Sequence, residues 1–161
     1  MVSPIESLVD AFSTERRLLE ELIAVMRRQR DAVGGDDLQG VDDTVFATHR
    51  VLVTLAESRR RRRTLNTLIG YSEDLGIHAL DEALGPRMTP ALRVARDELH
   101  GAARTLAREV SLNRRILREA LACGDAFARA LAGAEASPTY GAKSKATPAR
   151  AQANSLVDRR I

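Results

Sequence analysis

The feature that most constrains this chain is one long amphipathic pattern between Thr89 and Leu131. Apolar residues recur there at steps of three and four, which is the spacing of one face of an α-helix. These residues are Leu92, Ala95, Leu99, Ala103, Leu106, Val110, Leu117, Ala120 and Phe127, with Asn113 as a polar exception among them. Thr89-Pro90 is typical of a helix start, and Gly133 of a helix end. A helix of about 40 residues is roughly 60 Å long, so we expect it to pack against other long helices.

Two further long helices are predicted before this one. Ser3-Pro4-Ile5-Glu6 has the pattern of a capping box, from which a first helix extends to about Val33. The sequence Gly34-Gly35-Asp36-Asp37 ends it, and a second helical pattern extends from about Leu38 to Ile69. Residues 70–88 are interrupted by glycines and a proline, which indicates a structured connector with one or two helical turns over Ile77 to Leu84. The expected fold is all-α, an elongated antiparallel bundle or coiled coil of three long helices.

Composition supports this fold and divides the chain into two parts. Aromatic residues make up 3% of the 161 residues and tryptophan is absent, which argues against a β-sandwich or barrel. Arginines and acids balance over residues 1–133, so the net charge of +3 comes from residues 134–161. That segment is small, polar and basic. We therefore expect a helical bundle domain over 1–133 and a flexible, disordered basic tail over 134–161. A neutral body also argues against nucleic acid as a partner.

The arginine run Arg59 to Arg63 is the most conspicuous local feature. Five consecutive residues span the whole circumference of a helix, so they cannot form one binding face. The apolar seam predicted for the second helix is Val41, Val45, Thr48, Leu52 and Leu55, followed by Arg59, Arg62, Asn66 and Ile69. In a hairpin of the first two helices, Arg59 is level with Glu15, where the first apolar stripe also lapses. We expect Arg59 or Arg62 to contact Glu15, or Asp97 or Glu98, in a partly exposed polar layer.

Few residues indicate a reaction or a bound metal. His49, His78 and His100 are scattered without a second ligand at a suitable spacing, so we predict no metal site. Cys123 is expected to be a buried or half-buried thiol without catalytic partners. No catalytic residues and no cofactor are predicted, and enzyme function is disfavoured. The first ten residues lack a basic signal region and no apolar run is long enough to span a membrane, so a cytoplasmic protein is expected.

Some residues of the last helix are candidates for binding a partner. Asn113 lies among aliphatic residues, where a buried amide either fixes the register of the helices or contacts a partner. If the first and last long helices start level with each other, the first reaches only to about Glu119. Leu121, Phe127 and Leu131 would then be unpaired, and an exposed apolar stripe of this kind suits another amphipathic helix. Dimerisation would cover it equally well.

Three segments together resemble the FlgN-type flagellar export chaperones. They are ESLVDAFSTERRLLEELI near the amino terminus, the run LAESRRRRRTLNTLIGYSEDLG, and SLNRRILREAL followed by a small-residue tail with Pro-Thr-Tyr-Gly. The resemblance implies a cytosolic chaperone that binds flagellar hook-associated proteins, prevents their premature assembly and delivers them to the export gate. It implies that substrate is received by the end of the last helix and the tail, and that a tail tyrosine docks at the gate. The predicted partner-binding residues are Asn113, Leu117, Leu121, Phe127, Leu131, Tyr140 and Gly141.

A different class of function also fits the helical pattern. A homo-oligomeric coiled-coil scaffold or adaptor would show the same long amphipathic helices, and a homodimer is compatible with either function. Such a scaffold predicts a mass that depends on protein concentration without any client. A nucleic-acid-associated helical protein is the weaker alternative, and it predicts salt-dependent binding that is lost when Arg60 and Arg61 are changed.

Overall fold

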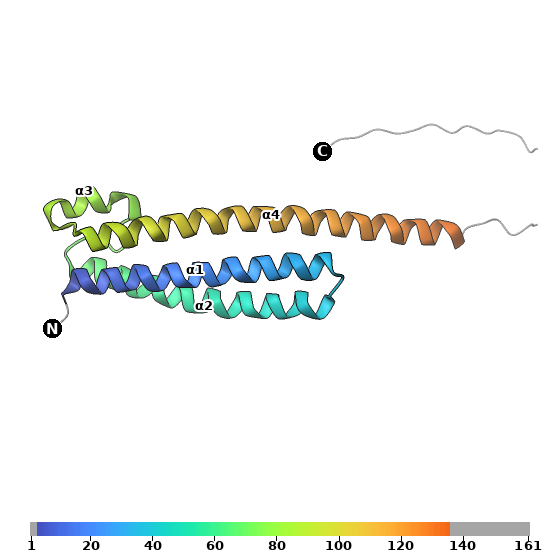
Figure 1. The fold of residues 1–161 in the computed structure, drawn as a ribbon, viewed down its shortest axis with the longest axis horizontal. Helices are drawn as coiled ribbons and strands as arrows, with labels where there is room; N and C mark the ends of the chain where they lie inside the picture. The colour runs from blue at the N-terminus through green and yellow to red at the C-terminus, as the bar shows by residue number, and fades with distance from the viewer. Residues whose placement is uncertain (1–2, 136–161) are drawn as a thin grey trace, which may run out of the picture. The chain divides into compact units, whose positions relative to one another are not determined.

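The computed structural model describes residues 3–135, and every regular element in that range is helical. Figure 1 shows the long helices and the short helix of the connector. The elements are α1 (Pro4–Gly34), α2 (Leu38–Leu68), η1 (Ile77–Ala79), α3 (Leu80–Leu84), η2 (Gly85–Arg87) and α4 (Pro90–Glu135), where η denotes a 3₁₀ turn. The all-α prediction is confirmed. The helix count differs from the predicted three because α3 forms in the connector.

The chain divides into two compact units, residues 1–125 and residues 126–161. The first unit holds α1, α2, α3 and most of α4. Of the second unit, the structure describes the last turns of α4 from Ala126. Most of the predicted basic tail, with Tyr140 and Gly141, lies outside the described residues, so its flexibility remains a prediction.

Local capping explains where the long helices begin. The Ser3 hydroxyl accepts a hydrogen bond from the amide of Ile5 at 3.3 Å, and the Glu6 carboxylate accepts one from the amide of Ser3 at 2.8 Å. This confirms the predicted capping box. At the start of α4, the Thr89 hydroxyl accepts from the amide of Leu92 at 3.2 Å. Each cap satisfies a first-turn amide that has no partner within its own helix.

The turn between α1 and α2 forms at the predicted acidic and glycine-rich sequence. Asp36 adopts a φ of 54°, a left-handed conformation that aspartate tolerates better than most residues. The Asp37 carboxylate then accepts a hydrogen bond from the amide of Gly40 at 2.9 Å and caps α2. This short turn makes α1 and α2 an antiparallel hairpin, as Figure 1 shows.

The apolar core joins all four helices at the end of the bundle where α1 and α4 begin. Leu8, Phe12, Leu19 and Leu22 of α1 meet the other helices there. The other helices contribute Val51, Leu55, Leu80, Leu84, Leu92, Ala95 and Leu99. The connector is therefore part of the core, because α3 inserts two fully buried leucines that its short, glycine-punctuated sequence did not reveal.

The apolar face predicted for α2 is wrong in its first half. Thr44, Val51 and Leu55 are buried, whereas Val45 and Leu52 are exposed. Residues 44, 51 and 55 share one side of the helix. Val45 and Leu52 lie about 100° further round the helix axis. The heptad pattern selected the exposed pair because α2 carries apolar residues on more than one side.

Two predictions for the end of the last helix also need correction. The helix continues past Gly133 to Glu135, because a glycine inside a helix weakens it without necessarily ending it. Cys123 is exposed, whereas a buried or half-buried thiol was expected. Every side chain described from Arg118 to Gly133 is exposed, so the cysteine has no helix packed over it.

Candidate partner-binding site

A buried ion pair fixes α2 against α1. Arg62 Nε donates to Glu15 Oε1 at 2.8 Å, and the side chains of Glu15 and Arg62 are only 3% and 15% exposed. This confirms the predicted polar layer, with Arg62 rather than Arg59 as the partner. Arg16, the next residue in α1, lies 3.4 Å from Glu98 of α4. The remainder of the arginine run spreads around α2, with Arg59, Arg60 and Arg61 exposed.

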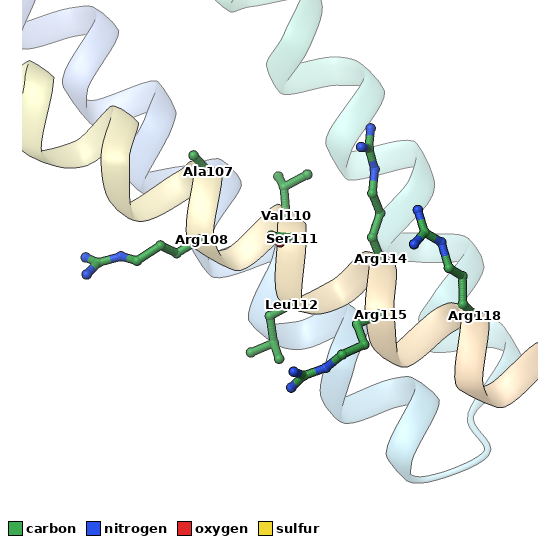
Figure 2. Close-up of a pocket in the computed structure, with 8 residues that line it drawn as sticks. All are labelled: Ala107, Arg108, Val110, Ser111, Leu112, Arg114, Arg115 and Arg118. Atoms are coloured by element: carbon green, nitrogen blue, oxygen red, sulfur yellow. The ribbon is translucent and has the colours of Figure 1, made fainter.

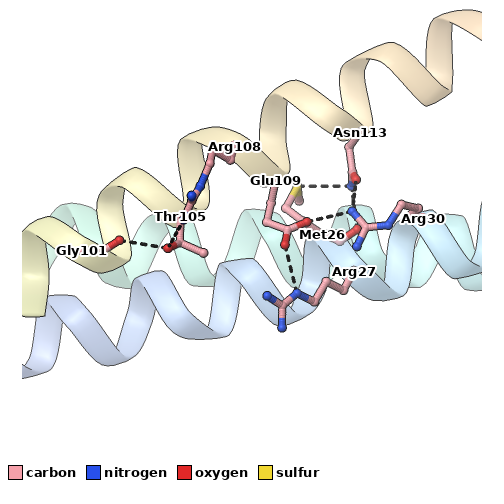
Figure 3. A network of polar contacts seen from close by, with 8 residues as sticks. All are labelled: Met26, Arg27, Arg30, Gly101, Thr105, Arg108, Glu109 and Asn113. Atoms are coloured by element: carbon pink, nitrogen blue, oxygen red, sulfur yellow. Dashed lines mark hydrogen bonds and ion pairs between the residues drawn. The ribbon is translucent and has the colours of Figure 1, made fainter.

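A second polar network holds α4 along α1, and Figure 3 shows its members. Glu109 Oε1 accepts from Arg27 Nε at 3.1 Å, and Glu109 Oε2 accepts from Arg30 Nη1 at 2.8 Å. The hydrogen bonds from Arg30 and then from Arg27 lower the pKa of Glu109 below its ordinary value, because both favour the charged carboxylate. Sequence reasoning missed this network. The available signal was the pair of arginines three residues apart on α1, on one side of the helix.

Asn113 is the next polar residue of α4 in this network and is buried. Its Nδ2 donates to the Met26 carbonyl oxygen at 2.6 Å, while its Oδ1 accepts from Arg30 Nη1 at 3.2 Å (Figure 3). Nδ2 also donates to Gln29 Oε1 at 3.2 Å. These contacts join the amide to α1 at one position along the helix. They agree with a role in fixing helix register, and the predicted contact with a partner remains a prediction.

Beyond Asn113 the apolar face of α4 loses its cover. Leu117 is half-buried, and Leu121, Phe127 and Leu131 are 70%, 67% and 55% exposed. Asn113, Leu117 and Leu121 follow helical steps that keep them on the side of α4 that carries the buried Leu92 and Leu99. Phe127 and Leu131 lie on the flank of this side, about 100° and about 60° round the helix axis from Leu92. Leu121 therefore continues the core-forming side of α4 without cover, and Phe127 and Leu131 are further exposed apolar side chains on the same helix.

An apolar groove within the first unit contains two of the predicted partner-binding residues. Leu117, Ala120, Leu121 and Gly124 of α4 form one side of the groove. The other side is the turn of the α1–α2 hairpin, and it contributes Ala32, Val33, Leu38 and Val41. The cavity measures about 340 Å³, and Asp36, Asp37 and Asp125 also line it. The hairpin side was not predicted, because only the fold brings residues 32–41 opposite residues 117–125.

A larger hollow of about 600 Å³ follows α4 itself between Ala107 and Arg118. All of its lining residues belong to this helix, and Figure 2 shows its four arginines. Arg114 and Arg118 extend in one direction, whereas Arg108 and Arg115 extend in others. Their divergence leaves no single basic face for an extended anionic partner.

Two histidines that are distant in the sequence meet in the fold, in a described part of the chain without other metal-binding or membrane-spanning features. His78 and His100 meet edge to face, with ring centroids 4.8 Å apart, although 22 positions separate them in the sequence. Residues 3–135 contain no group of three or more histidine, cysteine or acidic side chains suited to a metal ion. No helix in this part of the chain combines the length and apolar character that crossing a membrane requires.

The helical bundle and its buried polar layers define an all-helical protein with exposed apolar side chains on α4. The family model described as "FlgN protein" matches residues 1–148. The chain belongs to the FlgN family, as the sequence resemblance predicted. Neither the comparison with curated proteins nor that with solved structures gave a match.

Proposed function

We propose that this protein is a cytoplasmic chaperone that binds hook-associated subunits of the flagellum and delivers them to the export gate. Membership in FlgN, a family of flagellar export chaperones, supports the general role. The choice of client and the delivery step are inferred from the sequence resemblance. The client would dock on the uncovered apolar face of α4, centred on Leu121, Phe127 and Leu131.

The exposure of that face is the observation that carries the proposal. A helix that presents large apolar side chains at helical spacing is suited to a second amphipathic helix. Burying each of these side chains would contribute roughly 1.5–3 kcal/mol. A client whose terminal helices polymerise through an apolar face would have that same face covered on α4. Premature assembly would be prevented by competition for one surface.

Small residues on α4 favour close approach of a client helix. Ala120, Gly124 and Ala128 lie between the large side chains along the helix. Apart from the backbone of its own helical turns and its chain neighbours, no atom lies within 4 Å of the position where a Cβ on Gly124 would be placed. The surface is therefore open there. Tyr140 and Gly141 follow α4 in the sequence, and we propose that they contact the export gate.

The experiment is a calorimetric titration with a purified hook-associated subunit. Phe127→Ala combined with Leu131→Ala should weaken binding by more than tenfold, which corresponds to about 1.4 kcal/mol. Circular dichroism should be unchanged, since both side chains are exposed. The matched control combines Leu68→Ala with Val94→Ala, because these side chains are 70% and 57% exposed on other surfaces.

The control variant should bind the client like the unchanged protein. Normal binding by the Phe127/Leu131 variant would place the client site elsewhere. Equal weakening by both variants would show that general apolar exposure, rather than this face, determines binding. If no subunit of this class binds at all, the proposed function is wrong, and a self-associating scaffold becomes the better interpretation.

A further inference from the structure

A second apolar surface lies on α2, away from the core. Val45, Phe46, Leu52 and Val53 are all exposed, and Phe46 is the most exposed of the four at 74%. Val45, His49, Leu52 and Ala56 follow steps of four, three and four residues, which align them along one side of a helix. Phe46 and Val53 flank this line. We call these six residues the outer stripe of α2.

The outer stripe is distinct from the side of α2 that faces the bundle. Thr44, Val51 and Leu55 are buried, and Arg62 reaches Glu15 from that same side. At about 100° per residue, the centre of the outer stripe lies more than a quarter-turn from these residues. It therefore remains uncovered when α1, α2 and α4 are assembled.

Opposite charges flank the outer stripe at its two ends. Asp42 lies three residues before Val45, at one end of the stripe. Arg60 lies four residues after Ala56, at the other end, with Arg59 adjacent. All three side chains are exposed, and none of them forms an ion pair within the part of the chain that the structure describes. Along the line from Val45 to Ala56 the surface thus has an acidic end, a mainly apolar centre and a basic end, and the exposed Arg50 and Glu57 lie beside Phe46 and Val53 at its edge.

We propose that the outer stripe of α2 binds the outer stripe of a second copy of this chain, with the two helices antiparallel. A two-fold axis near residues 50 and 51 would place Asp42 of each copy opposite Arg59 and Arg60 of the other. Val45 would face Ala56, and His49 would face Leu52. An interface of this kind is self-complementary, because each contact occurs twice.

The charges at the two ends of the outer stripe favour an antiparallel helix pair and favour a second copy of this chain as the partner. A parallel pair would place Asp42 against Asp42 and Arg60 against Arg60, and both contacts would be repulsive. An unrelated amphipathic helix would need an inverted charge order to match both ends. A second copy has that order automatically when it is turned end to end. This surface is separate from the proposed client face on α4, so the two functions can be tested independently.

Sedimentation equilibrium of the full chain tests the proposal. A single helix pair is at the small end of protein interfaces, so the mass should be followed from about 5 μM to about 500 μM. We expect a monomer–dimer equilibrium in this range. Phe46→Glu should weaken the dimer by at least tenfold, since the symmetric interface carries the change twice. The side chain is exposed, so helicity should be preserved.

A charge exchange gives a sharper test of orientation. Asp42→Lys alone should weaken the dimer, and Arg59→Glu with Arg60→Glu should also weaken it. All three changes together should restore the dissociation constant of the unchanged protein, because both ends are reversed and remain complementary. Asp43→Lys with Arg61→Glu is the matched control. Those exposed residues lie on another side of α2, and the dimer should be unaffected.

Several results would overturn the proposal. A monomer throughout the concentration range would do so, as would a dimer that tolerates Phe46→Glu. Failure of the triple exchange to restore the dimer would exclude the antiparallel arrangement. A dimer abolished by Leu131→Glu but not by Phe46→Glu would place self-association on α4.

Discussion

Loss of the Arg62 side chain is expected to destabilise the protein much more than loss of any other arginine in the run. Glu15 is 3% exposed, and its carboxylate is 2.8 Å from Arg62 Nε. In Arg62→Met the carboxylate remains in the interior without its cation. Breaking a buried pair in this way costs about 3–5 kcal/mol. Because Arg62 itself retains some contact with water, we expect the lower end of that range, about 3 kcal/mol.

Thermal and urea unfolding at neutral pH, followed by circular dichroism, measure this loss. A loss of about 3 kcal/mol should lower Tm by roughly 10 °C for a bundle of this size. Arg61→Met is the matched control, since Arg61 is the exposed neighbour on the same helix and should change stability by less than about 0.5 kcal/mol. The sequence alone indicated a small effect, because it suggested a partly exposed pair.

Replacing Glu15 and replacing Arg62 should not destabilise the protein equally. Glu15→Gln leaves Arg62 near the surface, where its long side chain can reach water, so we expect a smaller loss than for Arg62→Met. Replacing both residues together, Glu15→Leu with Arg62→Met, should restore most of the stability, because no buried charge remains. Equal stability of Arg62→Met and Arg61→Met would refute the assignment of this pair as a buried structural contact.

Two further predictions concern the network between α1 and α4. Asn113→Leu should lower the free energy of unfolding by about 1–2 kcal/mol, measured in urea, since it removes hydrogen bonds to Met26 and Arg30 in a buried site. Glu109 has a lowered pKa, so its ion pairs with Arg30 and Arg27 stabilise the fold above the ordinary glutamate pKa of about 4.3 and less as pH falls through the lowered value. Glu109→Gln should reduce the urea midpoint at pH 7 and reduce its fall towards pH 3, and an unchanged acid profile would contradict this assignment.

The positions of the long helices could be predicted from the sequence because their signals are local. The capping box at Ser3, the break at Gly34-Gly35 and the Thr89-Pro90 start each act within one or two helical turns. The polar layer was predictable for a related reason. Glu15 interrupts one apolar stripe and Arg62 another, and a hairpin with a short turn brings the two interruptions level. The exposure of Leu121 followed from helix lengths alone.

The candidate site was only half predictable from the sequence. Leu117 and Leu121 could be identified on the last helix, because helical spacing places them on its apolar face. Leu38 and Val41 complete the groove from the hairpin turn, far away in the sequence. No local pattern records which loop lies opposite a given helical turn. That information belongs to the packing of α1, α2 and α4.

The sequence by itself determined that the chain is all-helical, where its long helices begin, and which polar residues would interrupt the core, since periodicity and capping are properties of neighbouring residues. Only the tertiary structure decided which side of α2 is buried. Val45 and Leu52 match the heptad pattern as well as core residues do, yet they are exposed, whereas Thr44 and Val51 are buried. The physical reason is that a helix with apolar residues on two sides can bury either, and the combined contacts of α1, α3 and α4 determine which one faces the core.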